Sequence, residues 1–105
     1  MPQKRVARRH NLALPVILSE LPQKPRMIHG TTRDISTHGF YFTTDLSVKN
    51  GLSLEFSFTL PADIHQENEA TIAGMARVVR VERLGSGSNK IGVAVAIESF
   101  KVSAL

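Results

Sequence analysis

The chain contains no cysteine and no tryptophan. The absence of cysteine excludes disulfide bonds, thiolate metal sites and a cysteine nucleophile. No apolar run is long enough to span a membrane, and the basic residues 1–5 are not followed by the apolar stretch of a signal peptide. With 105 residues, 42% of them hydrophobic, the chain has the size and composition of one globular domain. We expect a cytoplasmic domain without membrane insertion.

Acidic residues are also missing from the first part of the chain, where the positive charge is concentrated. Lys4, Arg5, Arg8 and Arg9 are four of the 13 basic residues, and the remaining nine are balanced by nine acidic ones, so the net charge of +4 comes from this segment. A local basic cluster predicts an anionic partner at one place, although a solvated tail is the simpler alternative. We therefore interpret residues 1–10 as a flexible basic ligand-binding arm.

Hydrophobic and polar residues alternate over much of the chain, which predicts β-strands. The clearest alternation covers residues 52–60 and ends at Pro61. Weaker patterns predict further strands over residues 12–18, 27–35, 40–44, 70–84 (with a bulge at Val78 and Val79) and 91–97. No helical periodicity is evident. These patterns predict an all-β fold with little or no helix: six antiparallel strands over residues 11–100, as a compact, split β-barrel or a strongly bent sheet, followed by a C-terminal tail, 101–105.

One short polar stretch lies between the second and third predicted strands. Because alternate residues of an extended chain share a face, Asp34 and Ser36 point to one side and Ile35 to the other. The carboxylate accepts hydrogen bonds, whereas the hydroxyl both donates and accepts them. Gly39 permits either a positive φ or the close approach of another group to the backbone. We interpret the stretch as a polar recognition element at the rim of the sheet, which is compatible with local hydrogen bonds in a turn.

The arm and this polar stretch complement each other chemically. The guanidinium groups of Arg5 and Arg9 can bind phosphate, contact the O6/N7 edge of guanine and stack on a flat base. The carboxylate of Asp34 can accept the N–H groups of the guanine Watson–Crick edge. Together these groups suit guanine with phosphate better than phosphate alone.

Other kinds of site are not favoured. Asp34, Ser36 and His38 have the same parity, but side chains two apart on a strand stand side by side, and no nucleophile elbow is present; we expect no enzyme. The histidines lack metal-ligand spacing, so we expect no metal. The glycine- and serine-rich residues 85–90 lack the spacing and the helix of a phosphate-binding loop. Arg77 and Arg80 are predicted to lie on a solvated face.

The motif Arg5-x-x-x-Arg9, followed after the first predicted strand by Asp34-x-Ser36-x-x-Gly39, resembles the PilZ domain family. The resemblance extends from the arm to about residue 100. It implies a six-stranded barrel that binds the bacterial second messenger cyclic di-GMP, with no other cofactor. By this resemblance, Arg5 and Arg9 clamp phosphates and guanine edges, Asp34 and Ser36 hydrogen-bond a guanine, and Gly39 keeps the surface open where the base lies.

Lys4 and Arg8 are secondary candidates, because a shifted clamp register would use this pair in place of the arginines. The residue before the first arginine is also implied to influence whether one ligand or a stacked pair is bound. The resemblance implies a regulatory module that passes ordering of the arm to a protein partner or attached effector domain. The alternatives are a ligand-free interaction domain and, less favoured, a nucleic-acid-binding barrel. We expect no DNA or RNA partner, because the body of the chain is neutral and has one tyrosine and no tryptophan for base stacking.

Overall fold

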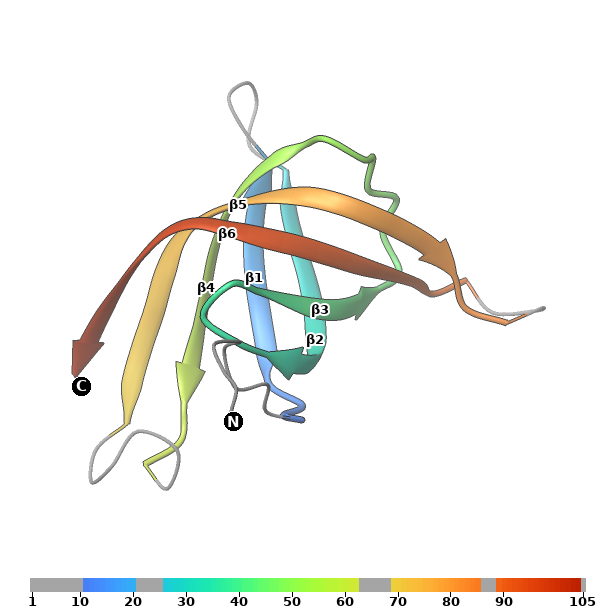
Figure 1. Ribbon diagram of the computed structural model, residues 1–105. Helices are drawn as coiled ribbons and strands as arrows, with labels where there is room; N and C mark the ends of the chain where they lie inside the picture. The colour runs from blue at the N-terminus through green and yellow to red at the C-terminus, as the bar shows by residue number, and fades with distance from the viewer. Residues whose placement is uncertain (1–10, 21–25, 63–68, 86–88, 105) are drawn as a thin grey trace, which may run out of the picture.

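The computed structural model describes residues 11–20, 26–62, 69–85 and 89–104. Six antiparallel strands close into a barrel in the order β1-β2-β3-β6-β5-β4, and the described residues contain no helix (Figure 1). The predicted all-β barrel is therefore confirmed. The strands are β1 (Pro15–Glu20), β2 (Met27–Ile35), β3 (Gly39–Thr44), β4 (Ser53–Leu60), β5 (Ala70–Arg83) and β6 (Ile91–Ala104).

The barrel interior is filled by the inward-facing residues of all six strands. The alternation predicted over 52–60 is seen in β4, where Leu54, Phe56 and Phe58 are buried. The ring of Phe40 on β3 lies 5.1 Å from that of Phe56 and 5.5 Å from that of Phe58, both edge-on. Such aromatic pairs contribute about 0.5–1.5 kcal/mol each beyond the burial of their area. Since β4 pairs with β1 and β5 and not with β3, this cluster packs across the interior of the barrel between two strands that are not neighbours in the sheet.

A β-bulge near the end of β2 changes which residues face outward. Thr32 pairs with Phe42 and Asp34 with Tyr41, so Arg33 is an extra residue in the ladder. Without it, the inward position of Thr32 would be followed by an inward Asp34. The extra residue turns Asp34 to the outer face and the buried Ile35 to the core. This bulge explains why the hydrophobic pattern of residues 27–35 is weak.

The bulge predicted at Val78 and Val79 is confirmed in β5. Val78 pairs with Val95 and Arg80 with Ala94, which leaves Val79 as the extra residue. Val78 is buried in the core, whereas Val79 is 53% exposed on the outside. The bulge therefore brings Val79 and Arg80 to the outer surface beside β6.

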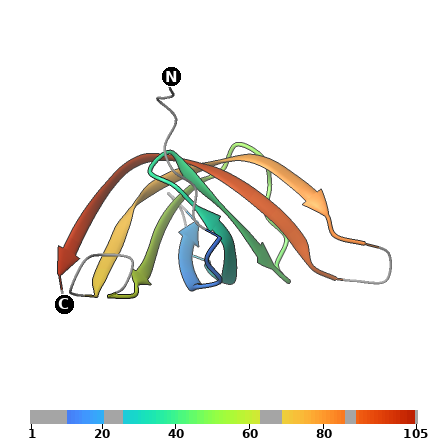
Figure 2. The ribbon, with the colours of Figure 1, turned by 60° about the horizontal axis from the view of Figure 1, so that its bottom comes forward.

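The last strand is longer than the sequence predicts. β6 continues to Ala104, and residues 101–104 pair with residues 70–73 of β5 rather than forming a tail. Glu98 is an extra residue in this ladder, so the alternation of residues 91–97 does not continue in phase. β3 pairs with β6 only as far as Ala96, and the β5–β6 ribbon curves away from the barrel beyond this point (Figure 2).

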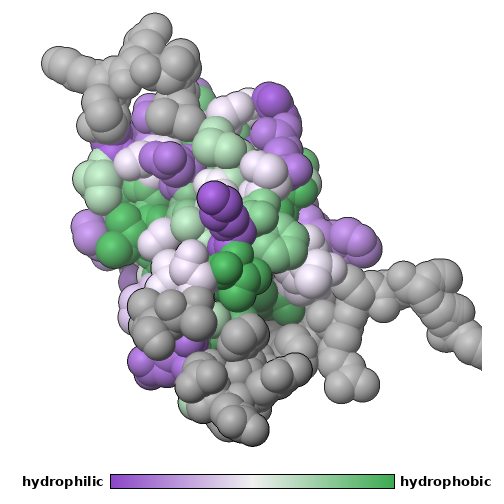
Figure 3. Space-filling model, turned by 90° about the vertical axis from the view of Figure 1, so that its left-hand side faces the viewer, coloured by the Kyte–Doolittle hydropathy of each residue, from purple (hydrophilic) through white to green (hydrophobic). Residues whose placement is uncertain are grey.

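The curved end of this ribbon exposes two large hydrophobic side chains. Phe100 is 45% exposed and Val102 is 46% exposed. The side of the molecule near the end of β6 carries hydrophobic and hydrophilic residues in alternating patches (Figure 3). The described part of the chain contains no helix that is long and apolar enough to cross a membrane.

Candidate functional site

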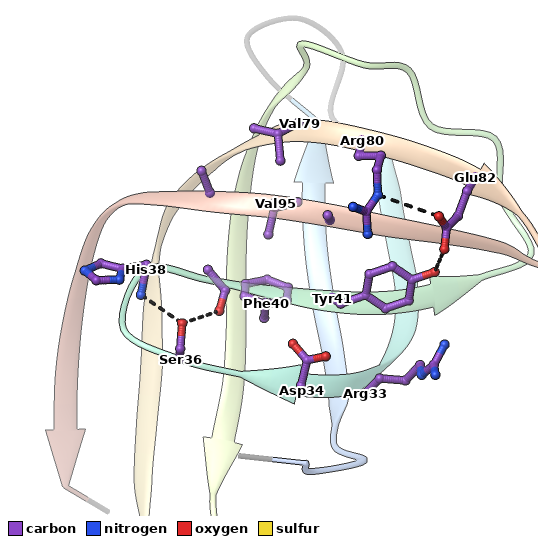
Figure 4. A pocket seen from close by; sticks show the side chains of 13 residues that line it. Arg33, Asp34, Ser36, His38, Phe40, Tyr41, Val79, Arg80, Glu82 and Val95 are labelled. Carbon is purple, nitrogen blue, oxygen red and sulfur yellow. Dashed lines mark hydrogen bonds and ion pairs between the residues drawn. The ribbon is translucent and has the colours of Figure 1, made fainter. Parts of the chain in front are cut away.

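A hollow of about 470 Å³ lies on the outer surface of the barrel, bounded by the end of β2, the β2–β3 turn, β5 and β6 (Figure 4). Asp34 and Ser36 line it from the end of β2 and the turn. Ala94 and Ala96 line it from β6, where the small side chains leave the outer face of the sheet accessible. The hollow therefore has polar groups along its wall, and small apolar side chains of β6 form another part of its surface.

The β2–β3 turn is held by the side chain of Ser36. Its hydroxyl accepts a hydrogen bond from the backbone N–H of His38 at 3.2 Å and donates one to the carbonyl oxygen of Gly39 at 3.3 Å. The backbone N–H of Ser36 donates to the same carbonyl at 2.9 Å. The expected local hydrogen bonding is thus present at Ser36. Because the single hydroxyl proton is used within the turn, Ser36 offers a ligand an acceptor lone pair rather than a donor.

Gly39 lies where two strands approach closely. A Cβ atom at this position would lie 2.2 Å from the carbonyl oxygen of Val95 on β6. The described glycines with positive φ are Gly51 and Gly85, so Gly39 is not required for an unusual backbone angle. Of the two reasons for a glycine weighed from the sequence, close approach is the one that applies here, and the approaching group is the backbone of β6. Gly39 also lines the hollow.

Beside Asp34, the hollow carries a second polar group, which we call the Tyr41 cluster: Arg33, Tyr41, Arg80 and Glu82 (Figure 4). The phenol of Tyr41 donates a hydrogen bond to Oε2 of Glu82 at 2.6 Å. The guanidinium carbons of Arg33 and Arg80 lie 5.3 and 6.0 Å from the centroid of the Tyr41 ring. Nε of Arg80 also lies 3.6 Å from Oε1 of Glu82. The cluster thus holds two guanidinium groups at one end of the hollow.

Sequence reasoning missed the Tyr41 cluster. It assigned Arg80 to a solvated face, and the side chain is indeed 62% exposed, but it also lines the hollow. The predicted bulge at Val79 was the available signal, because an extra residue changes the face that Arg80 occupies. Gly92 was a second signal: a Cβ atom there would overlap the phenol of Tyr41. Neither signal reveals from sequence alone that Arg33 and Tyr41 are neighbours.

The predicted arm residues Lys4, Arg5, Arg8 and Arg9 lie outside the residues that the structure describes. Their ligand role stays a prediction. The structure brings the other predicted residues, Asp34, Ser36 and Gly39, to one hollow. Within the described ranges, no group of three or more histidine or acidic side chains is arranged to hold a metal ion.

Tyr41 should titrate above the usual range of a phenol. Burial raises its pKa above the ordinary value of 10.0, and the hydrogen bond to Glu82 and that carboxylate's charge raise it further, while Arg33 and Arg80 lower it. The folded state then holds the phenol proton more tightly than the unfolded chain. Its contribution to stability is present below pH 10.0 and is lost as the pH rises through the folded pKa.

The chain has one tyrosine and no tryptophan, so ultraviolet absorbance reports this phenol alone. We expect a titration midpoint above 10.0 in the folded protein and a lower midpoint in Glu82→Gln, which removes the negative charge. Glu55→Gln, on the exposed side of β4, is the control and should leave the midpoint unchanged. An identical midpoint in the parent and Glu82→Gln would contradict the assigned contact.

Comparison with known proteins identifies a family and a shared fold. Residues 3–100 match the family model described as PilZ domain. No curated protein sequence matches the chain. Seven chains of known structure are similar. One is the Bacillus subtilis inhibitor of motility (MotI/DgrA), with a TM-score of 0.71 and 24% sequence identity; the match covers 95% of this chain but 45% of that protein. The chain therefore shares the fold of this protein and spans less than half of its length.

Proposed function

The chain belongs to the PilZ domain family, and from this premise we propose that it is a non-catalytic receptor module for cyclic di-GMP. The observation that carries the proposal is the position of Asp34 and Ser36 on one wall of the 470 Å³ hollow. Small-molecule sites typically have volumes of about 300–1,000 Å³ and few convergent polar groups. A hollow of this size with a carboxylate at its edge suits a nucleotide that presents N–H donors.

Each residue has a specific role in this proposal. The carboxylate of Asp34 accepts hydrogen bonds from the N1–H and N2–H groups of one guanine. The remaining lone pair of Ser36 accepts another, since its proton is donated to Gly39. Arg5 and Arg9 of the arm bind the phosphates, which carry the two negative charges of the ligand.

The output of the module is a change of the arm and its surroundings. Four basic residues within the first nine are drawn to a bound dianion, and a segment that becomes ordered on binding can present a new surface. A protein partner or an attached effector domain would read this change. Lys4 and Arg8 supply further charge, or an alternative clamp register.

Calorimetric titration of the full chain with cyclic di-GMP tests this function. We expect saturable binding, an increase in melting temperature, and a stoichiometry that distinguishes one bound ligand from a stacked pair. Binding should persist at salt concentrations that remove a purely electrostatic ligand, because hydrogen bonds to base edges contribute. The absence of both heat and thermal stabilisation would overturn the proposal and favour a ligand-free interaction domain.

Asp34→Ala should reduce the preference of the protein for guanine. Losing a bidentate contact to a base edge costs about 1–3 kcal/mol, so we expect the affinity ratio between cyclic di-GMP and cyclic di-AMP to fall by about 10- to 100-fold. Asp45→Ala is the matched control, because Asp45 is exposed, lies outside the hollow and pairs with Lys90 at 3.4 Å. A ratio that is unchanged in Asp34→Ala would show that Asp34 does not read the base.

A further inference from the structure

The second half of β6 has a neighbouring strand on one side only. Residues 99–104 pair with β5, whereas β3 reaches β6 only as far as Ala96, and the N–H of Ile97 donates to the carbonyl oxygen of His38 at 2.8 Å where β3 begins (Figure 2). Alternate residues of an edge strand direct their N–H and C=O groups away from the sheet. Within the described ranges, no strand pairs with residues 99–104 on that side. This free edge of β6 can therefore accept one more strand.

The face of the free edge that continues the barrel interior is apolar. Val102 lies directly opposite Ile72 of β5, which in turn lies opposite Phe58 of β4, and the last two are buried. Because paired residues of neighbouring strands share a face, Val102 is on the core side of the sheet, yet it is nearly half exposed. Phe100, two residues earlier, shares this face and is exposed to the same extent. The core layer of the sheet is thus left uncovered at this edge.

An apolar pocket of about 140 Å³ lies beside these two side chains. It is bounded by β6, the β2–β3 turn, the end of β4 and the start of β5, and its lining residues are Ile35, Ser36, Thr37, Phe58, Leu60, Ile72, Ile97 and Phe100. A cavity of roughly this size accommodates a benzene ring. Since both β6 and the β2–β3 turn line the pocket, a strand added to the free edge would place an apolar side chain in it. Such pockets give specificity for alternate residues of an added strand.

On the outer face of the free edge, Lys101 carries a charge that no described residue neutralises. Its neighbours on this face of β6 are two serines, and no ion pair of Lys101 occurs among the described residues. Arg77 and Glu98, which are charged and lie nearby on β5 and β6, form an ion pair of their own at 3.1 Å. A strand that places acidic side chains opposite Lys101 would therefore be favoured.

The same charge argues against pairing of the free edge with a second copy of the chain. Antiparallel self-pairing in one continuous sheet places residues of the same face opposite each other. If the pair were centred on any residue from 100 to 102, the two copies of Lys101 would lie opposite or diagonal to each other, where like charges are destabilising. A lysine on an edge strand commonly prevents self-association in this way. That role leaves the edge open to an acidic partner.

We propose that the free edge of β6, residues 99–104, is a docking site for an extended segment of a partner protein in which apolar and acidic residues alternate. The segment adds a strand to the sheet through backbone hydrogen bonds. Its apolar side chains contact Phe100 and Val102 and enter the pocket, while its acidic side chains face Lys101. This inference goes beyond the proposed function, and it requires no nucleotide, because residues 99–104 do not line the hollow.

The test measures binding of fluorescent synthetic peptides of equal length to the full chain without nucleotide. One peptide alternates valine and glutamate, a second groups the same residues in blocks, and a third alternates valine and lysine. We expect the alternating acidic peptide to bind about tenfold more tightly than the grouped one and about fivefold more tightly than the basic one. N-methylation of either the valines or the glutamates, but not of both sets equally, should weaken binding, because only alternate N–H groups face β6.

Two pairs of variants place the peptide on this edge. Lys101→Glu should reverse the preference in favour of the basic peptide, whereas Lys49→Glu, at an exposed lysine outside the edge and its pocket, should not. Val102→Asp should weaken binding by about tenfold. Leu46→Asp makes the same kind of change at an exposed hydrophobic residue of another surface and should leave binding unchanged. Thermal unfolding checks that each barrel is intact.

Three results would overturn the docking site: no binding of the alternating acidic peptide, equal binding of the grouped peptide, or an unchanged charge preference in the folded Lys101→Glu variant. Sedimentation of the parent addresses self-pairing. A concentration-dependent dimer that Val102→Asp dissociates would assign the edge to a second copy instead. None of these results bears on cyclic di-GMP, whose binding is measured separately by calorimetric titration.

Discussion

The Arg9→Ala variant is expected to lose cyclic di-GMP binding by about 100-fold or more, because hydrogen bonds to charged groups contribute about 1.5–3 kcal/mol each and Arg9 is proposed to make at least two. Calorimetric titration of the parent and the variant with cyclic di-GMP measures this loss. The melting temperature without ligand should not change, because Arg9 is assigned to the binding arm and not to a strand of the barrel. A fall of several degrees in the free variant would contradict the assignment of Arg9 to a binding arm.

Arg8→Ala is the control that this prediction needs. It removes the same charge from the neighbouring position, so any long-range electrostatic effect on the dianion is matched. We expect a modest loss, within about tenfold, from reduced attraction alone. If Arg8→Ala and Lys4→Ala abolish binding while Arg9→Ala retains it, the clamp uses the shifted Lys4–Arg8 register.

The strands were predictable where a single hydrophobic phase persists. In β4 the alternation runs without interruption, and the residues expected inside, such as Phe56, are buried. The phase changes at Arg33 in β2 and at Glu98 in β6, where an extra residue shifts the register. A bulge moves every later side chain to the other face, so a pattern read by parity ends there. For this reason the second half of β6 was not predicted.

The candidate site was predictable only in part, for the same physical reason. Asp34 and Ser36 both follow the bulge at Arg33, so their relative parity is unaffected and both line the hollow, as expected. The Tyr41 cluster joins residues of β2, β3 and β5, and these are brought together by barrel closure rather than by local spacing. Sequence patterns indicate how residues close in the chain are oriented relative to one another, but they do not indicate which residues of distant strands come into contact.

Gly39→Ala is expected to cause the largest loss of stability among these substitutions. The added Cβ would lie 2.2 Å from the carbonyl oxygen and 3.3 Å from the carbonyl carbon of Val95. Both are backbone atoms within the β3–β6 ladder, where Gly39 pairs with Ala96 and Phe40 with Val95, so neither atom moves aside without disturbing hydrogen bonds. Overpacking of this kind costs about 2–3 kcal/mol, which lowers the melting temperature of a domain of this size by roughly 10–20 °C.

Thermal unfolding without ligand, followed by circular dichroism, separates the two roles of this glycine. Ala96→Ser is the control, because it adds one heavy atom to the residue paired with Gly39, on the open side of the same ladder, and should change stability by less than about 0.5 kcal/mol. If Gly39→Ala melts like the parent but no longer binds cyclic di-GMP, the glycine serves the ligand alone. The close approach to Val95 predicts instead that Gly39→Ala lowers the melting temperature of the free protein, because the β3–β6 contact is weakened. Binding of cyclic di-GMP should fall as a consequence, because the turn that holds Ser36 ends at Gly39.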